Sequence, residues 1–406
     1  MKRLTACCQY LIPGLLIAVS AEAANPANTG LFASANTAET AYINPAGMVR
    51  LNETSHTLQG IFIHSFIELD VDENRTTVDG GDPDKDDTPI IIPGFYYVKP
   101  LNNDWRLGFS MNIPSGFGSD YGNDWAGRYY TDNYSLVYVG LTPSVAYRID
   151  EHWSVGASLN ATYTYTESEV AINNPGSSQP DGKLKYDGDD IAYTATISML
   201  YQWNDQTRLG ISYTGETESK VEGDIELKRL GPLLDATLGK LDGKSLKVDT
   251  IMPQRLQAGI YHQFDSGRFM TADAIWVDFS EFGTGDLSIE DGRVIQPEGI
   301  YNDIWGLTFG MGFPVDAQTT WKFGAIYLSK AVDDDKRTMA LRLDRIWGLG
   351  VGISRKLENS SLDVNFNLYN TGDASVDTGT NNRLRGQVVG ESDTPYAIAL
   401  DVAWHW

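Results

Sequence analysis

Five histidines and two serine motifs are the residues of this chain that could support nucleophilic catalysis. A serine hydrolase needs a serine that is activated by a nearby histidine. The serine motifs, "GFSMN" at 108–112 and "GASLN" at 156–160, both miss the Gly-x-Ser-x-Gly spacing. We therefore expect no enzymatic activity and keep a lipid hydrolase only as an alternative. The histidines are His56, His64, His152, His262 and His405.

Two further motifs resemble ligand-binding loops, but each fails at a required position. "GKLDGKS" at 239–245 resembles a phosphate-binding loop, which needs a glycine where Leu238 stands. "DGGDPDKDD" at 79–87 lacks the Gly and Glu positions of an EF-hand loop. We interpret it as a solvated acidic loop, with weak divalent-cation binding to surface lipopolysaccharide as the alternative. The sequence predicts no cofactor and no metal site.

The composition excludes other classes of partner and site. The formal net charge is -23, which argues against nucleic acid as a partner because phosphate binding needs basic patches. The chain has two cysteines, Cys7 and Cys8, and both fall in a segment that we expect to be removed. The mature protein is therefore expected to lack disulfides and thiolate metal sites.

The N-terminus has the three regions of a secretory signal peptide. A short basic start is followed by an apolar run at 10–20 and by the small-x-small sequence Ala21-Glu22-Ala23. We predict a signal peptide at 1–23 and a mature start at Ala24. Leu4-Thr-Ala-Cys7 resembles a lipoprotein cleavage box, but it precedes the apolar run, whereas a true box follows it.

Apolar residues recur at every second position along much of the chain, which is the pattern of β-strands. Any site that the chain carries must therefore be positioned by strands. The last eleven residues, "YAIALDVAWHW", put an apolar residue at each alternate position, and Trp153 begins another alternating run. After the signal peptide no stretch approaches the roughly 20 apolar residues of a membrane helix. A membrane protein of this sequence would therefore be a barrel.

The connections between the strands alternate in length. Six short turns and seven long polar loops follow one another strictly, which makes fourteen strands. Short turns at one rim and long loops at the other are typical of outer-membrane barrels. We predict an all-β fold, a transmembrane antiparallel β-barrel, and keep a soluble sandwich as the alternative. The long loops are predicted near 71–89, 114–134, 168–188, 216–247, 280–300, 331–341 and 371–393.

The terminal strand would close this barrel. Its apolar face would meet lipid, with Trp404 and Trp406 in an aromatic girdle, and no backbone edge would be left in hydrocarbon. A terminal aromatic residue on such a strand resembles the signal that the outer-membrane assembly machinery reads. We therefore expect Trp404 and Trp406 to form an assembly signal, the assembly machinery and outer-membrane lipid to be partners, and the location to be the outer membrane of a Gram-negative bacterium.

The segment 24–56 precedes the first clear strand and is rich in small and polar residues. It contains the turn signal Asn44, Pro45, Ala46 and Gly47. Here the sequence resembles the FadL-type outer-membrane transporters of long-chain fatty acids and other hydrophobic compounds. The resemblance extends to "FGSDYGNDWAGRYY" at 117–130, "LTPSVAYRIDEHWSVGASLNATY" at 141–163, "MPQRLQAGIYHQF" at 252–264 and "DRIWGLGVG" at 344–352.

The resemblance implies a fourteen-stranded barrel at 57–406 that is plugged by a hatch at 24–56. It implies passive uptake of a hydrophobic small molecule, which leaves sideways through a gap beside an inward kink in the third strand. The matching residues are Pro114, Gly116, Phe117 and Gly118, and their types suit a bulge or bend. The alternative is that this strand simply ends at Ile113.

The family also meets a ligand carboxylate with basic side chains inside the barrel. The inward face of 153–166 carries no Lys or Arg, so Lys322 is the candidate for this contact. The segment before Asn44 is also shorter than the family's usual hatch. A general diffusion porin remains the main alternative function, because it shares the barrel but needs no hatch.

Overall fold

The computed structural model describes residues 30–84, 89–339, 341–342, 344–380 and 384–406. The predicted signal peptide, both cysteines and the first six residues of the predicted hatch lie outside these ranges. No helix in the described ranges is long and apolar enough to cross a membrane.

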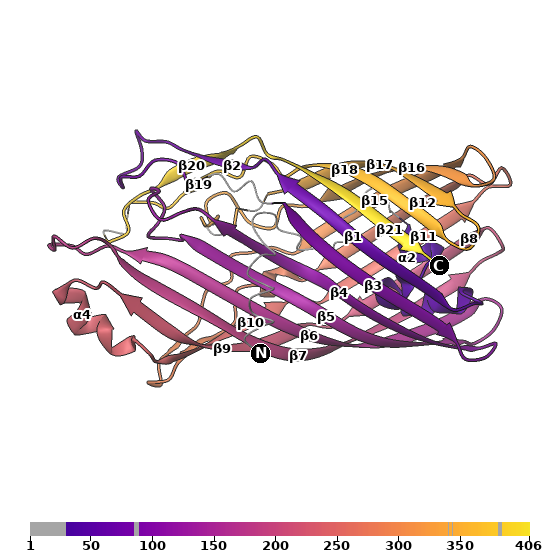
Figure 1. Cartoon of the computed structure of the whole chain (residues 1–406), viewed down its shortest axis with the longest axis horizontal. Helices are drawn as coiled ribbons and strands as arrows, with labels where there is room; N and C mark the ends of the chain where they lie inside the picture. Colours follow the sequence, from indigo (N-terminus) through magenta and orange to yellow (C-terminus); the bar gives the residue numbers. More distant parts are fainter. Residues whose placement is uncertain (1–29, 85–88, 340, 343, 381–383) are drawn as a thin grey trace.

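The chain forms one closed antiparallel β-barrel of fourteen strands (Figure 1), which confirms the predicted fold. The first strand, β1, pairs with the last, β21, from Thr57–His405 to Ser65–Ala397, and this ladder closes the wall. Two of the fourteen strands are each built from two consecutive segments, β8 with β9 and β10 with β11. The wall consists of β1 (Ser55–Ser65), β3 (Ile90–Pro100), β4 (Trp105–Asp120), β5 (Asn133–Arg148), β6 (Trp153–Ile172), β7 (Gly182–Gln202), β8 (Thr207–Thr214), β9 (Thr217–Lys228), β10 (Ser245–Met252), β11 (Arg255–Gln263), β12 (Phe269–Val277), β15 (Ile304–Pro314), β16 (Thr319–Leu328), β17 (Ile346–Lys356), β18 (Ser361–Asn370) and β21 (Tyr396–His405).

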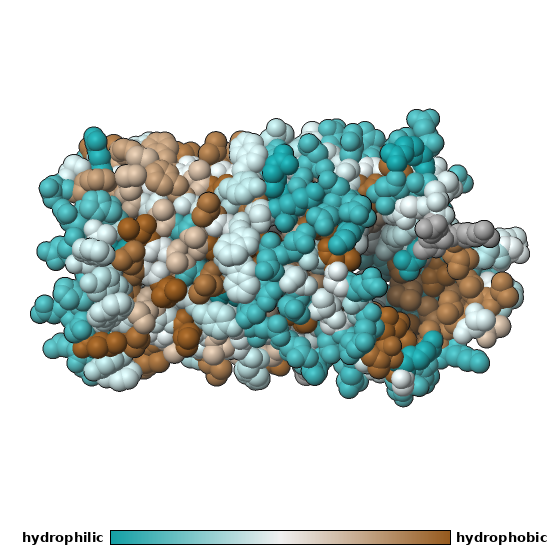
Figure 2. Space-filling view, turned by 180° about the vertical axis from the view of Figure 1, so that it is seen from behind, coloured by the Kyte–Doolittle hydropathy of each residue, from teal (hydrophilic) through white to brown (hydrophobic). Residues whose placement is uncertain are grey.

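The period of two in the sequence separates an apolar outer face from a mixed inner face. In β15, for example, Trp305 and Leu307 are exposed outside, whereas Ile304 is buried inside. Figure 2 shows apolar side chains gathered over one half of the outer wall and mostly hydrophilic side chains over the other half. An outer-membrane barrel needs such an apolar band to face lipid.

The two ends of the barrel differ as the sequence predicts. The short-turn end carries the brief turns, among them 101–104 and 149–152, together with the C-terminus. The loop end carries the long connections. These include β2 (Glu68–Val71), α4 (Pro232–Leu238), η3 (Gly239–Leu241), η4 (Phe279–Glu281), β13 (Leu287–Ile289), β14 (Val294–Ile295), β19 (Val376–Asp377) and β20 (Val389–Asp393).

Several strands continue further toward the loop end than the polarity of their residues suggested. The predicted loops at 168–188 and 216–247 are wrong in their bounds, because β6 and β7 extend into the first and β9 and β10 into the second. Charged residues there form cross-strand ion pairs, such as Lys185 with Glu167 at 2.9 Å and Lys247 with Glu222 at 3.1 Å. Such pairs suit a ladder that extends into water, where a polar sequence does not mark a loop.

The described part of the predicted hatch folds into three short helices near the short-turn end (Figure 1). They are α2 (Leu31–Ser34), α3 (Thr40–Ile43) and η2 (Pro45–Arg50), and β1 then begins at Ser55. These helices contact strands on several sides of the wall, including β3 to β8 and β11. Most of their residues are buried, so the helices lie within the lumen.

Candidate functional site

The ladder between β3 and β4 stops part of the way along the wall. Its described pairs run from Pro100–Arg106 to Phe95–Met111. Beyond that point β3 continues to pair with β1 as far as Ile90, and β4 continues to pair with β5 as far as Asp120. Residues 90–94 and 112–120 therefore face each other without a described ladder. We call this part of the wall the β3–β4 break.

A β-bulge in β4 accounts for the break. The register against β5 shifts between Asn112 and Ser115, so that Ile113 and Pro114 together stand opposite Val139. Proline cannot donate a backbone hydrogen bond, and a bulge bends its strand and interrupts pairing. The strand does not end at Ile113, so that alternative is wrong.

The predicted opening residues lie in or just after this bulge. Pro114 is part of it, and Gly116, Phe117 and Gly118 follow in the segment that pairs only with β5. The Phe117 ring packs against Phe282, with ring centroids 5.6 Å apart. Phe117 therefore joins the break to the apolar interior described next.

Apolar side chains line the lumen behind the break. They come from the inner faces of β12, β15 and β16 and from the loops that follow, and they form one buried cluster, which we call the apolar cluster. A second, smaller group of Ile61, Ile63, Ile90 and Ala399 lies on the β3 side. Both sides of the break thus present hydrocarbon toward the lumen. The apolar cluster consists of Ile275, Val277, Phe279, Ile304, Ile326, Leu328, Ala331, Val332 and Leu341, with Phe117, Phe282, Tyr301, Ile346 and Tyr369 packed against it.

The motif Asn44 to Gly47 joins the hatch to the barrel wall. Within the hatch, Asn44 Nδ2 donates to Phe32 O at 3.0 Å. Toward the wall, Ala46 N donates to Ser198 Oγ at 2.9 Å, and Ser154 Oγ donates to Ala46 O at 3.0 Å. Gly156 makes this approach possible, because a Cβ there would lie 2.2 Å from Ala46 N. The motif therefore anchors the hatch to β6 and β7.

Inward arginines hold the hatch at further points. Arg106 Nε on β4 donates to Leu51 O at 2.8 Å, and Arg148 Nη2 on β5 donates to Val49 O at 2.5 Å. Arg208 Nε on β8 donates to Ala33 O at 3.2 Å. Hydrogen bonds with a charged donor are the stronger ones. These three arginines were not predicted as hatch contacts, although an arginine on the polar face of a strand is a signal for an inward contact.

The predicted carboxylate contact, Lys322, lies near the start of β16 rather than at the break. Its Nζ is 2.7 Å from Asp363 Oδ2, and both side chains are largely buried. Asp363 also lies 3.9 Å from His405 Nε2, and the His405 Nδ1 atom is 3.7 Å from Glu39 Oε2 in the hatch. A ligand carboxylate would therefore compete with Asp363 for Lys322.

The terminal tryptophans lie on the outside of the short-turn end. Trp404 is 46% exposed, and its ring centroid is 4.7 Å from that of Trp406. Trp406 stacks on His56 at 5.1 Å, while His56 N donates to Trp406 O at 2.8 Å. This position joins the two strands that close the barrel. A role for the pair as an assembly signal stays a prediction.

A family model and related proteins place the chain in the same family. Residues 15–402 match the family model described as "Outer membrane protein transport protein (OMPP1/FadL/TodX)". The chain is 24% identical to outer membrane protein P1 of Haemophilus influenzae over 394 residues, which cover 86% of this chain and 84% of that protein. It is 22% identical to a long-chain fatty acid transport protein of Escherichia coli over 307 residues, 67% of this chain and 68% of that one.

Solved structures show the same fold. A Pseudomonas aeruginosa FadL homologue has a TM-score of 0.83 at 18% identity, covering 98% of this chain and 99% of that one. The Ralstonia pickettii toluene transporter TbuX has a TM-score of 0.67 at 18% identity, and the match covers 95% of this chain and 97% of that one. From the family match over nearly its whole length, the chain belongs to the OMPP1/FadL/TodX family of outer-membrane transport proteins.

Proposed function

We propose that this protein takes up hydrophobic compounds across the outer membrane and releases them sideways through the β3–β4 break. The observation that carries the proposal is the coincidence of the break with the apolar cluster, through Phe117. In this model the ligand enters from the loop end, binds among the apolar side chains and passes between β3 and β4 into lipid. The hatch stays in the lumen throughout and blocks the axial route.

Burial of apolar surface favours this route over release into water. An apolar ligand gains about 25 cal/mol for each Å² that it removes from water. Release into the periplasm would forfeit that gain, whereas sideways release into the membrane keeps it. Passive movement down a concentration gradient then needs no nucleotide and no cofactor.

The substrate class is hydrophobic compounds, with long-chain fatty acids as one candidate. A relative is named for long-chain fatty acid transport, whereas a structural neighbour is named for toluene transport. The apolar groups behind and beside the break suit both kinds of molecule. Because Lys322 is paired with Asp363, a fatty-acid carboxylate has no preformed partner at that position.

The outer surface of the barrel indicates the other proposed partners of the protein. Outer-membrane lipid and lipopolysaccharide would surround the apolar band, and the assembly machinery would receive the terminal strand with Trp404 and Trp406.

The rival functions fit less well. A general diffusion porin needs an aqueous lumen, and the contacts of the hatch helices with β3 to β8 and β11 support a blocked one. A lipid hydrolase would be an enzyme in a family of transport proteins.

Uptake and conductance measured on the same wild-type protein test the proposal. We expect cells that express the protein to accumulate a radiolabelled hydrophobic tracer about tenfold faster than cells without it. We also expect the purified protein in planar bilayers to conduct ions only weakly, because in this model the hatch blocks the lumen. High conductance without tracer uptake would establish a porin and contradict the proposal.

A further inference from the structure

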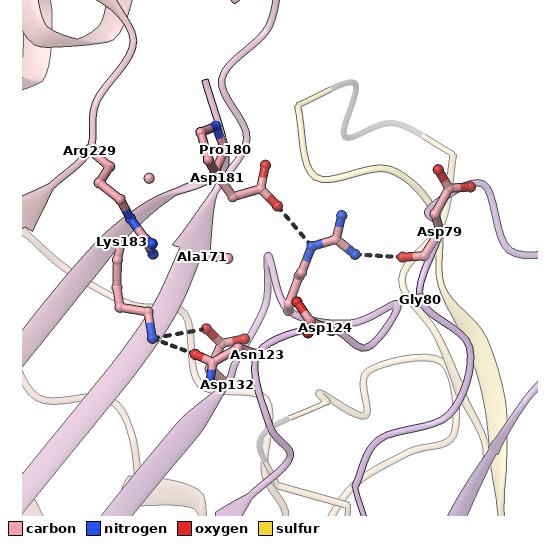
Figure 3. A pocket seen from close by; sticks show the side chains of 12 residues that line it. Asp79, Gly80, Asn123, Asp124, Asp132, Ala171, Pro180, Asp181, Lys183 and Arg229 are labelled. Carbon is pink, nitrogen blue, oxygen red and sulfur yellow. Dashed lines mark hydrogen bonds and ion pairs between the residues drawn. The ribbon is translucent and has the colours of Figure 1, made fainter. Parts of the chain in front are cut away.

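A pocket of about 580 Å³, lined mainly by charged and polar residues, lies at the loop end of the barrel. Its lining comes from residues 79–80, from four residues of the loop between β4 and β5, from the end of β6, from 180–183 at and just before the start of β7, and from Arg229 after β9 (Figure 3). Figure 3 shows Lys183 and Arg229 on one wall, with Asn123 and Asp132 near the tip of the Lys183 side chain. Segments far apart in the sequence thus converge on one polar cavity.

Asp132 lacks the hydrogen bonds that a buried carboxylate needs. It is 2% exposed, and neither carboxylate oxygen has a hydrogen-bond partner within the described residues. The nearest cation, Lys183 Nζ, lies 4.0 Å away and already contacts Glu169 and Asn123. Burial raises the pKa of Asp132 to about 7. A buried polar group in this condition calls for a further partner, such as a donor from a ligand.

Arg229 supplies a second cation on the same wall as Lys183. The side chain is exposed, and its guanidinium makes no ion pair or hydrogen bond with any described residue. The φ angle of Arg229 is 55°, a left-handed conformation that costs free energy for a residue with a side chain. Asn174 Nδ2 donates to Arg229 O at 2.9 Å and helps to hold this conformation. By contrast, Arg128 is already paired with Asp181 at 2.9 Å.

Asp132, whose oxygens have an ion pair with Lys183 at 4.0 Å but no hydrogen bond within the described residues, and Arg229 define the chemistry of a complementary ligand. Guanidinium groups bind phosphate oxygens well, and a carboxylate accepts hydrogen bonds from hydroxyl groups. A ligand that satisfies both needs a phosphate for Arg229 and hydroxyl donors for Asp132. We propose that this pocket binds a phosphorylated saccharide.

Simpler ligands satisfy the pocket less well. A bare phosphate would meet Arg229 but would be repelled by ionised Asp132. For a metal ion, the described residues offer no group of three histidine, cysteine or acidic side chains that could hold it. A phosphorylated saccharide could come from lipopolysaccharide in the surrounding membrane or from a free sugar phosphate in the medium. Neither source is part of the proposed hydrophobic transport.

Equilibrium dialysis with radiolabelled glucose 6-phosphate tests the proposal on purified full-length protein that has been freed of lipopolysaccharide. We expect saturable binding that Arg229→Gln weakens about tenfold or more. We also expect Asp132→Asn to weaken it about threefold or more, because one acceptor oxygen is replaced by an amide donor and the negative charge is lost. Arg293→Gln is the matched control, since Arg293 lies in another loop and pairs with Asp291.

Competitors identify the source of the ligand. Displacement by lipopolysaccharide, but not by the same lipopolysaccharide after dephosphorylation, supports the proposal with the membrane as the source. Binding that lipopolysaccharide does not displace supports it with a free sugar phosphate as the ligand. The proposal is overturned if no saturable binding occurs. It is equally overturned if inorganic phosphate competes as well as glucose 6-phosphate and Asp132→Asn strengthens binding, since that pattern describes a bare anion site.

The Arg229→Gln variant also separates this inference from the proposed transport function. It should take up the hydrophobic tracer at the wild-type rate, because Arg229 belongs neither to the apolar cluster nor to the β3–β4 break.

Discussion

Deletion of Pro114 is expected to lower uptake of a hydrophobic tracer by about tenfold or more while the barrel still assembles. The deletion leaves one residue instead of two opposite Val139, which removes the bulge. The straightened β4 could then continue its ladder with residues 90–94 of β3 and close the wall. Phe117 would stay opposite Leu136 on the lumen face, so the deletion changes the wall and keeps this side chain inward.

Tracer uptake by cells and heat-modifiability of the purified barrel measure the two parts of this prediction. Pro114→Ala is the matched control, because it keeps two residues opposite Val139, and we expect it to retain most of the uptake. A deletion variant that assembles normally and transports at the wild-type rate would show that the break is not the exit.

Replacement of Arg106 by glutamine is expected to raise the ion conductance of the protein by about tenfold, because the hatch loses part of its attachment to the wall. Arg106 donates to two hatch carbonyls, Leu51 O at 2.8 Å and Val49 O at 3.3 Å. Hydrogen bonds of charged groups each contribute about 1.5–3 kcal/mol, so the loss should release this part of the hatch. Single-channel recording in planar bilayers measures the change.

The structure provides a second variant and a control for this experiment. Arg148→Gln removes another bond to Val49 O and should act in the same direction. Arg293→Gln alters an exposed loop arginine and should leave the conductance unchanged. If both hatch-contacting variants conduct like the wild type, the arginines do not hold the hatch closed.

The barrel was predictable because lipid and lumen impose a period of two on every strand. That pattern, together with the alternation of short turns and long loops, predicted fourteen strands correctly. It failed at the loop ends of β6, β7, β9 and β10, where the strands leave the membrane and apolar alternation is no longer required. There, cross-strand ion pairs such as Lys185 with Glu167 maintain the ladder.

Local composition was enough to predict the irregular strand, whereas contacts between residues far apart in the sequence could not be predicted. Pro114 and the neighbouring glycines indicated an irregular strand, and the structure has a bulge there. The partner of Lys322, by contrast, is Asp363 on β18, which no local pattern brings together with it. The bonds of Arg106, Arg148 and Arg208 to the hatch likewise depend on where the hatch lies inside the closed barrel.

Photolabelling tests sideways exit most directly. A hydrophobic ligand that carries a diazirine group would be bound to the wild-type protein in membranes and activated by light, and the labelled residues would be found by mass spectrometry. The proposed route predicts labels on β3 at 90–93, on β4 at 114–117 and in the apolar cluster. Labels concentrated instead on the hatch at 44–51 and on the wall residues next to it at the short-turn end would contradict sideways exit and establish an axial route.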